Sequence, residues 1–134
     1  MSQPRVVIID DEERFRTTLR KTLTLQGVQA ADFGSGREAL QALREQGADV
    51  VLLDLRMPEM DGLATLQAIK AIDPEIEVII LTGHASLDAA QEIIKLGAYD
   101  YLLKPCPTDE LLAKVESACE RQAVRRGPPR RDGQ

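Results

Sequence analysis

The chain has 134 residues, 43% of them hydrophobic and only 3% aromatic, and its 22 acidic side chains outnumber its 17 basic ones. This length fits one domain with a sizeable core, and apolar runs of at most four residues exclude a membrane-spanning helix and a secretory leader. Two cysteines, Cys106 and Cys119, are too few for a disulfide framework, so we expect a protein of the reducing cytoplasm.

The charge is divided unevenly along the chain. Residues 1–120 carry 12 basic and 21 acidic side chains, a net charge of −9, whereas residues 121–134 carry five arginines and one aspartate, a net charge of +4. We expect one domain over residues 1–120 and a basic tail over residues 121–134, whose glycines and prolines favour a disordered segment or the remainder of a linker. The acidic body argues against direct nucleic-acid binding, and the tail has no aromatic residue for base stacking.

Five apolar segments predict strands, at residues 6–9, 28–33, 50–53, 78–81 and 99–103. The first, third and fourth are unbroken runs rich in β-branched residues, which is typical of parallel strands buried on both faces. The second and fifth segments alternate apolar and polar residues, which indicates strands at the edges of a sheet.

A helix is predicted after each strand. Apolar residues recur there every three or four positions, as at Phe15, Leu19 and Leu23 after the first strand. Ser35 and Glu38 match a capping box at the start of the second helix. The chain is therefore predicted to repeat a strand–helix unit five times.

The strand order follows from the polarity of the strands. The second and fifth strands belong at the edges, which agrees with a flavodoxin-like, doubly wound α/β fold of (βα)5 type with a parallel sheet in the order 2-1-3-4-5. The Rossmann half-order would put the unbroken third strand at an edge. In the order 2-1-3-4-5 the winding reverses between the first and third strands, and ligands of such sheets bind at the carboxyl ends of the strands there.

Polar side chains follow the central strands at this carboxyl edge. Asp10 and Asp11 follow the first strand, Asp54 the third, Thr82 the fourth and Lys104 the fifth. Clustered carboxylates require protonation or a cation, and carboxylate oxygens suit Mg²⁺. A metal, a hydroxyl, an ammonium and a central carboxylate together indicate phosphoryl transfer, with Asp54 as a nucleophile that forms an acyl phosphate.

Each of these residues has an ordinary structural interpretation when taken singly. Asp10 or Asp11 alone is typical of a helix cap, Thr82 of a turn, and Lys104 of a solvated charge. Their joint placement at four strand ends is what favours a functional site.

The chain resembles two-component response regulator receiver domains over about residues 5–120. The resemblance lies in four motifs, at the family's order and spacing: residues 7–12 (VIIDDE), 53–62 (LDLRMPEMDG), 81–84 (LTGH) and 101–105 (YLLKP). Residues 54–62 and the pattern around residues 87–90 are particularly similar to receivers of the nitrogen-regulation type.

The resemblance implies a phosphoryl acceptor and a metal site. Asp54 would accept the phosphoryl group from the phosphohistidine of a sensor histidine kinase or phosphotransfer protein. Asp11 and Asp54 would bind Mg²⁺ directly, Asp10 would act through water, and the backbone carbonyl of Arg56 would complete the protein ligands.

The resemblance also implies a switch. Lys104 would pair with the phosphoryl oxygens, Thr82 would move to bond them, and Tyr101 would turn inward as Thr82 moves. The bond between Lys104 and Pro105 would be cis. The face formed by the fourth helix, fifth strand and fifth helix, roughly residues 86–120, would signal to a downstream effector or output domain, and a homodimer on phosphorylation is a family-level expectation.

Three alternatives remain beside this signalling receiver, which would be no enzyme beyond its own phosphorylation and dephosphorylation. An aspartyl-phosphate hydrolase of the haloacid-dehalogenase kind would need D-x-D-x-T, whereas residues 54–58 read D-L-R-M-P. A flavin- or nucleotide-binding module would need a glycine-rich or Ser/Thr-rich loop after the first strand. A phosphorylation-independent binding module would not need Asp54, Thr82 and Lys104 together.

Two further residues near the predicted site are less informative. His84, the single histidine, is expected at the rim of the pocket, where this position and Arg56 tune the lifetime of the acyl phosphate in the family. Cys106 stands where the family frequently has an aromatic residue; a half-buried thiol is the ordinary interpretation and a redox sensor the alternative.

Overall fold

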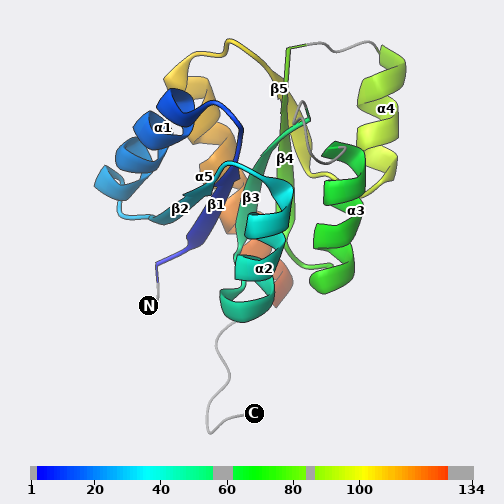
Figure 1. The fold of residues 1–134 in the computed structure, drawn as a ribbon, viewed down its shortest axis with the longest axis horizontal. Helices are drawn as coiled ribbons and strands as arrows, with labels where there is room; N and C mark the ends of the chain where they lie inside the picture. The colour runs from blue at the N-terminus through cyan, green and yellow to red at the C-terminus, as the bar shows by residue number, and fades with distance from the viewer. Residues whose placement is uncertain (1–2, 56–61, 84–86, 127–134) are drawn as a thin grey trace, which may run out of the picture.

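Five strands alternate with five helices in the computed structural model, which describes residues 3–55, 62–83 and 87–126 (Figure 1). In chain order they are β1 (Arg5–Ile9), α1 (Glu13–Leu25), β2 (Gln29–Phe33), α2 (Gly36–Gln46), β3 (Val50–Asp54), α3 (Gly62–Ile72), β4 (Glu77–Thr82), α4 (Leu87–Lys95), β5 (Asp100–Leu103) and α5 (Thr108–Arg126).

The strands form one parallel sheet in the order β2-β1-β3-β4-β5, which confirms the predicted fold and excludes the Rossmann half-order. The register places Ile9 beside Leu53 and Asp54 beside Leu81. The carboxyl ends of β1, β3 and β4 therefore meet at one edge of the sheet, where the loops carrying the predicted site begin.

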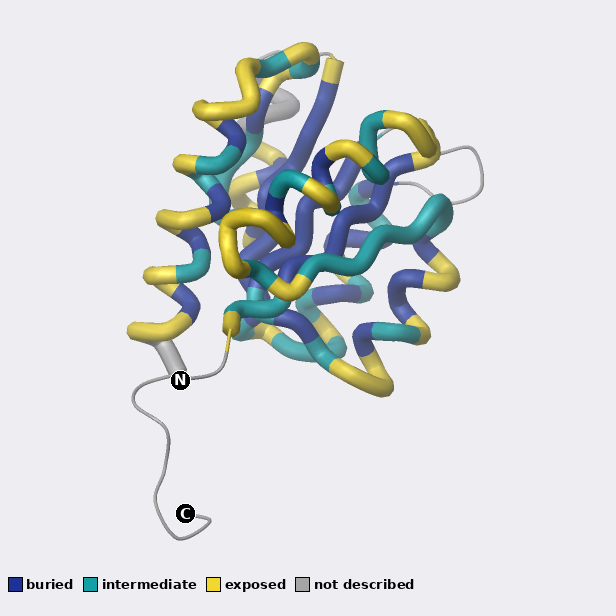
Figure 2. The backbone as a smooth tube through the Cα atoms, turned by 90° about the vertical axis from the view of Figure 1, so that its left-hand side faces the viewer, coloured by how far each residue is buried: buried dark blue, intermediate teal, exposed yellow. Residues whose placement is uncertain are grey.

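The central strands are buried on both faces, as their unbroken apolar runs predict (Figure 2). Alternate side chains of each strand enter two separate cores. One core packs against α2, α3 and α4, and the other packs against α1 and α5 (Figure 1). Each fully buried Val, Leu or Ile side chain contributes roughly 1.5–3 kcal/mol. Both faces are occupied by packing, so the carboxyl edge is the part of the sheet left for chemistry.

The start of α2 confirms the Ser35 bond of the predicted capping box. Ser35 has an extended backbone, and its hydroxyl accepts a hydrogen bond from the backbone N–H of Glu38 at 3.3 Å. This bond satisfies one of the N–H groups that a helix leaves without a partner in its first turn.

The last helix includes the first six residues of the predicted basic tail. Residues 121–126 belong to α5 and not to the tail, and Gln122 is buried. The Nε atom of Arg121 lies 3.3 Å from Oε2 of Glu77, and its guanidinium lies 5.5 Å from the centroid of the Tyr99 ring. The boundary at residue 120 followed a change in charge, whereas a helix ends where its backbone geometry fails, here just before Gly127 and Pro128. Residues 127–134, the rest of the predicted tail, lie outside the described residues.

In the described part of the chain, every helix is too short or too polar to cross a membrane.

Candidate functional site

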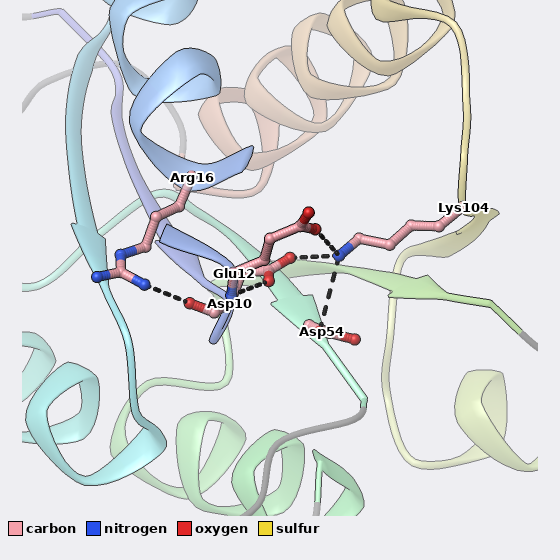
Figure 3. Close-up of polar contacts among 5 residues, drawn as sticks. All are labelled: Asp10, Glu12, Arg16, Asp54 and Lys104. Atoms are coloured by element: carbon pink, nitrogen blue, oxygen red, sulfur yellow. Dashed lines mark hydrogen bonds and ion pairs between the residues drawn. The ribbon is translucent and has the colours of Figure 1, made fainter. Parts of the chain in front are cut away.

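The carboxyl ends of the strands bring the predicted site residues together. Asp10 follows β1 directly, Asp54 is the last residue of β3, and Lys104 follows β5 (Figure 3). Thr82 is the last residue of β4. The strands β3 and β4 are thus each one residue longer at this end than predicted, because the predicted strands ended at residues 53 and 81. The backbone positions of Asp54 and Thr82 are fixed by the sheet, since the N–H of Leu55 still bonds to the carbonyl of Leu81 at 3.1 Å.

Three carboxylates form a cluster with the chemistry of a metal site. Asp10, Asp11 and Asp54 each offer an oxygen, and these oxygens lie within 4.8 Å of one another. Asp10 is 0% exposed and Asp54 is 6% exposed, whereas Asp11 faces solvent. Like charges held this close disfavour one another unless a cation compensates them, and hard oxygen ligands are those that Mg²⁺ prefers. The donor set therefore fits Mg²⁺. Arg56, whose carbonyl was expected as a further ligand, lies outside the described residues.

Lys104 brings a positive charge into the pocket. Its Nζ lies 2.5 Å from Oδ2 of Asp10, 3.7 Å from Oδ2 of Asp54 and 4.0 Å from Oε1 of Glu12 (Figure 3). Burial alone would lower the pKa of Lys104. The hydrogen bond to Asp10 and the negative charges of Asp10, Asp54 and Glu12 outweigh burial, so the pKa of Lys104 is raised. The ammonium also lies 4.4 Å from the centroid of the Phe15 ring. Lys104 therefore stays charged at neutral pH.

Of the two predicted switch residues, Thr82 lies at the carboxyl edge of the sheet and Tyr101 lies three residues before Lys104, in β5. Thr82 is buried at the end of β4, and the N–H of Lys104 donates to its carbonyl at 2.8 Å. Tyr101 pairs with Ile80 in the sheet and is half-buried against the core under α2, α3 and α4. The backbone thus links the pocket lysine, Thr82 and the strand that carries Tyr101.

The peptide bond between Lys104 and Pro105 is cis, as expected from the resemblance. Cys106, which follows, is a half-buried free thiol. Burial and the charge of Glu110 raise its pKa, against the opposing effect of Lys104. A protonated thiol is a poor nucleophile, which favours the ordinary interpretation of Cys106 over a redox sensor. His84, expected at the rim, lies outside the described residues.

Sequence reasoning did not identify the contacts that Glu12, Phe15 and Arg16 make at the pocket. Glu12 and Phe15 approach Lys104, and Arg16 bonds to the backbone of Asp10. The nearest signal was the spacing of Arg16 and Arg20, four residues apart and so on one face of α1. Which carboxylate that face meets depends on the strand order.

The family comparison agrees with this geometry. The sequence model of the response regulator receiver domain matches residues 6–116. The chain belongs to this family. The receiver is therefore a module of two-component response regulators, which act in phosphorylation-activated signalling, and the haloacid-dehalogenase alternative finds no support.

Curated relatives confirm the resemblance to the nitrogen-regulation type. The receiver is 46% identical over 113 residues to the transcriptional regulatory protein ZraR of Escherichia coli K12, covering 84% of the receiver and 26% of that protein. It is 45% identical over 125 residues to the DNA-binding transcriptional regulator NtrC of Klebsiella pneumoniae, covering 90% of the receiver and 27% of that protein. The receiver thus spans about a quarter of the length of these relatives.

Solved structures confirm the fold. A CheY-like response regulator receiver domain protein from Methanospirillum hungatei JF-1 superimposes with a TM-score of 0.88 at 25% identity, covering 94% of this chain and all of that one. A response regulator receiver domain protein from Clostridium thermocellum superimposes with a TM-score of 0.83 at 34% identity, covering 90% and 98%.

Proposed function

We propose that this receiver accepts a phosphoryl group on Asp54, from the phosphohistidine of a sensor histidine kinase or phosphotransfer protein, in a Mg²⁺-dependent reaction. One observation carries the proposal. Asp54 ends the central strand β3 with the carboxylates of Asp10 and Asp11 on one side and the ammonium of Lys104 3.7 Å away. This arrangement places the carboxylate of Asp54 in a metal-binding donor set and beside a positive charge.

The chemistry follows from these groups. A carboxylate oxygen of Asp54 attacks the phosphorus, the phosphorus–nitrogen bond breaks, and the histidine leaves with the electron pair and takes up a proton. Asp10, Asp11 and Asp54 would hold Mg²⁺, with the Arg56 carbonyl as a further ligand. The chemistry that Mg²⁺ supplies when bound is neutralisation of the carboxylates and phosphoryl oxygens. The protein's own part is largely positioning.

The product changes the charge of the pocket. An aspartyl phosphate carries about −1.5 to −2 in place of −1 and adds acceptor oxygens. Lys104, now bonded to Asp10, would move toward them, and the Thr82 hydroxyl would follow. Tyr101 would then turn inward and shift the population of the face formed by α4, β5 and α5.

Partners follow from that face. Leu103 and Ile94 are large apolar side chains exposed on β5 and α4. We infer that this surface contacts a downstream effector or output domain, or a second phosphorylated receiver. The two relatives are longer proteins that are named as transcriptional regulators. For this receiver we propose that it regulates transcription through an output domain. Beyond its own phosphorylation and dephosphorylation we propose no enzymatic activity and no direct nucleic-acid contact.

A labelling experiment tests the proposal. The protein is incubated with acetyl phosphate and Mg²⁺, and its intact mass is measured. We expect one added phosphoryl group, lost when Mg²⁺ is chelated and lost in Asp54→Asn. The control Asp109→Asn changes an exposed carboxylate at the start of α5 and should be labelled normally. A wild-type protein left unmodified by acetyl phosphate and other small phosphodonors would refute the proposal, and turnover of an added phosphoester would favour the hydrolase.

A further inference from the structure

Arg16 connects the acidic pocket to the edge of the sheet. Its Nη1 donates to the backbone carbonyl of Asp10 at 3.1 Å, and its Nε donates to Oδ2 of Asp32, at the end of β2, at 2.9 Å. Figure 3 shows Arg16 on the side of Asp10 away from Lys104. One guanidinium therefore joins two segments that are 22 residues apart in sequence but adjacent in the sheet.

The other polar groups of Asp10 are also held. Its N–H donates to the carbonyl of Phe33 at 3.1 Å, its Oδ1 accepts from the N–H of Glu12 at 2.8 Å, and its Oδ2 accepts from Lys104. Arg16 supplies the partner of the carbonyl, and so fixes the point where the chain leaves β1. Asp11, the exposed member of the carboxylate cluster, is attached directly to that carbonyl.

Two details show that the guanidinium is closely accommodated. A Cβ atom at Gly34 would lie 3.2 Å from Nη1 of Arg16, so the glycine leaves room for the arginine beside the end of β2. Arg20 binds the other oxygen of the same carboxylate, with its Nε 2.7 Å from Oδ1 of Asp32. Asp32 is thus held by two arginines, of which Arg16 continues to the pocket.

We propose that Arg16 is a positioning residue for Mg²⁺ binding. By bonding Asp32 and the Asp10 carbonyl at once, it holds the turn after β1 so that Asp10 and Asp11 present their carboxylates toward Asp54. This inference rests on the proposed Mg²⁺-dependent function. Groups that orient metal ligands typically change metal affinity about 10–100-fold when removed. We expect an effect near tenfold for Arg16, because Arg16 bonds to the backbone of the ligand residue Asp10 and not to its carboxylate.

Electrostatics alone predicts the opposite sign. Arg16 is a positive charge near a cation site, so deleting it would strengthen Mg²⁺ binding if charge were its only contribution. Positioning predicts weaker binding. Arg20 provides the matched control, because it carries the same charge and the same carboxylate partner from the next turn of α1.

The test compares Mg²⁺ dissociation constants of the full chain, measured by amide NMR titration. We expect Arg16→Met to weaken binding about tenfold, and Arg20→Met to stay within about twofold of wild type. Arg16→Lys should resemble Arg16→Met, since an ammonium cannot reproduce the planar fork that reaches both acceptors. At saturating Mg²⁺, Arg16→Met should reach the wild-type extent of acetyl phosphate labelling, because Asp54 and Lys104 are unchanged.

Several results overturn the inference. Arg16→Met that binds Mg²⁺ as tightly as Arg20→Met, or more tightly than wild type, refutes it, and so does wild-type affinity in Arg16→Lys. If Arg16→Met loses its folded NMR spectrum, the charge-retaining Arg16→Lys decides alone. A wild-type protein that binds Mg²⁺ but is never labelled would contradict the proposed function and leave the comparison of Mg²⁺ affinities standing.

Discussion

Replacing Lys104 by methionine should destabilise the receiver by about 2–3 kcal/mol in the absence of Mg²⁺. The substitution removes the ammonium that lies 2.5 Å from the carboxylate of Asp10, which is 0% exposed, 3.7 Å from that of Asp54 and 4.0 Å from that of Glu12. Removing one partner of a fully buried ion pair costs about 3–5 kcal/mol. The Lys104 side chain is 20% exposed, so water enters more readily and the cost is lower.

Lys114→Met is the matched control. Lys114 lies 2.5 Å from Oδ2 of Asp100, the same separation as in the pocket, but its side chain is 38% exposed. Exposed ion pairs contribute about 0–1 kcal/mol. Urea unfolding at pH 7 should therefore show a midpoint about 1 M lower for Lys104→Met and a small shift for Lys114→Met, given a slope of about 1–3 kcal/mol per M.

Added Mg²⁺ separates charge compensation from packing. A cation held by Asp10, Asp11 and Asp54 replaces part of the lost positive charge, so the stability difference between wild type and Lys104→Met should shrink as Mg²⁺ rises. Equal unfolding midpoints for Lys104→Met and Lys114→Met without Mg²⁺ would refute the reasoning. A difference that Mg²⁺ leaves unchanged would assign the effect to lost packing on Phe15.

Two further predictions concern titration. The folded pKa of Lys104 is raised above its ordinary value of 10.5, so the stability that the charged Lys104 contributes is present below pH 10.5 and is lost as pH rises through the folded pKa. The unfolding free energies of wild type and Lys104→Met should therefore differ by a constant amount from pH 7 to pH 9 and converge above pH 10.5. A convergence already complete by pH 9 would contradict this. Burial, with the charges of Asp49, Glu116 and Glu120, raises the pKa of Cys119 to about 11. Iodoacetamide at pH 8 should therefore modify Cys119 about 100-fold more slowly than a free cysteine, as measured by peptide mass, and unfolding in urea should restore the rate. Alkylation of the folded protein at the free-thiol rate would show that the thiol is not held protonated.

Much of this fold is encoded in local pattern. The β-branched runs identified the central strands, the alternation in residues 28–33 and 99–103 identified the edges, and those two facts fixed the order of the sheet. The site followed, because the carboxyl ends of neighbouring parallel strands meet. Asp10, Asp54, Thr82 and Lys104 could thus be placed together without knowledge of any side-chain direction.

The contacts around that site could not be predicted in the same way. Arg16 reaches Asp32 and the Asp10 carbonyl through a side chain whose direction depends on the packing of α1 against β2. Phe15 over Lys104 depends likewise on helix rotation. The basic tail was predicted to begin at residue 121, where the net charge changes sign, whereas α5 continues to Arg126, directly before the helix-breaking Gly127 and Pro128.

The extended α5 gives the receiver a lever. The helix starts four residues after Lys104, near the pocket, and its 19 residues make a rod ~28 Å long. Arg121 touches Glu77 at the opposite, amino-terminal end of β4, so the rod runs the full depth of the sheet with a fulcrum near its far end. A tilt of about 5° along such a rod displaces one end by about 2.4 Å relative to the other. About 20 Å of the rod lies on the pocket side of Arg121 and about 8 Å beyond it, so a displacement beside the pocket reaches the far side of the molecule reversed in direction and reduced to roughly two fifths.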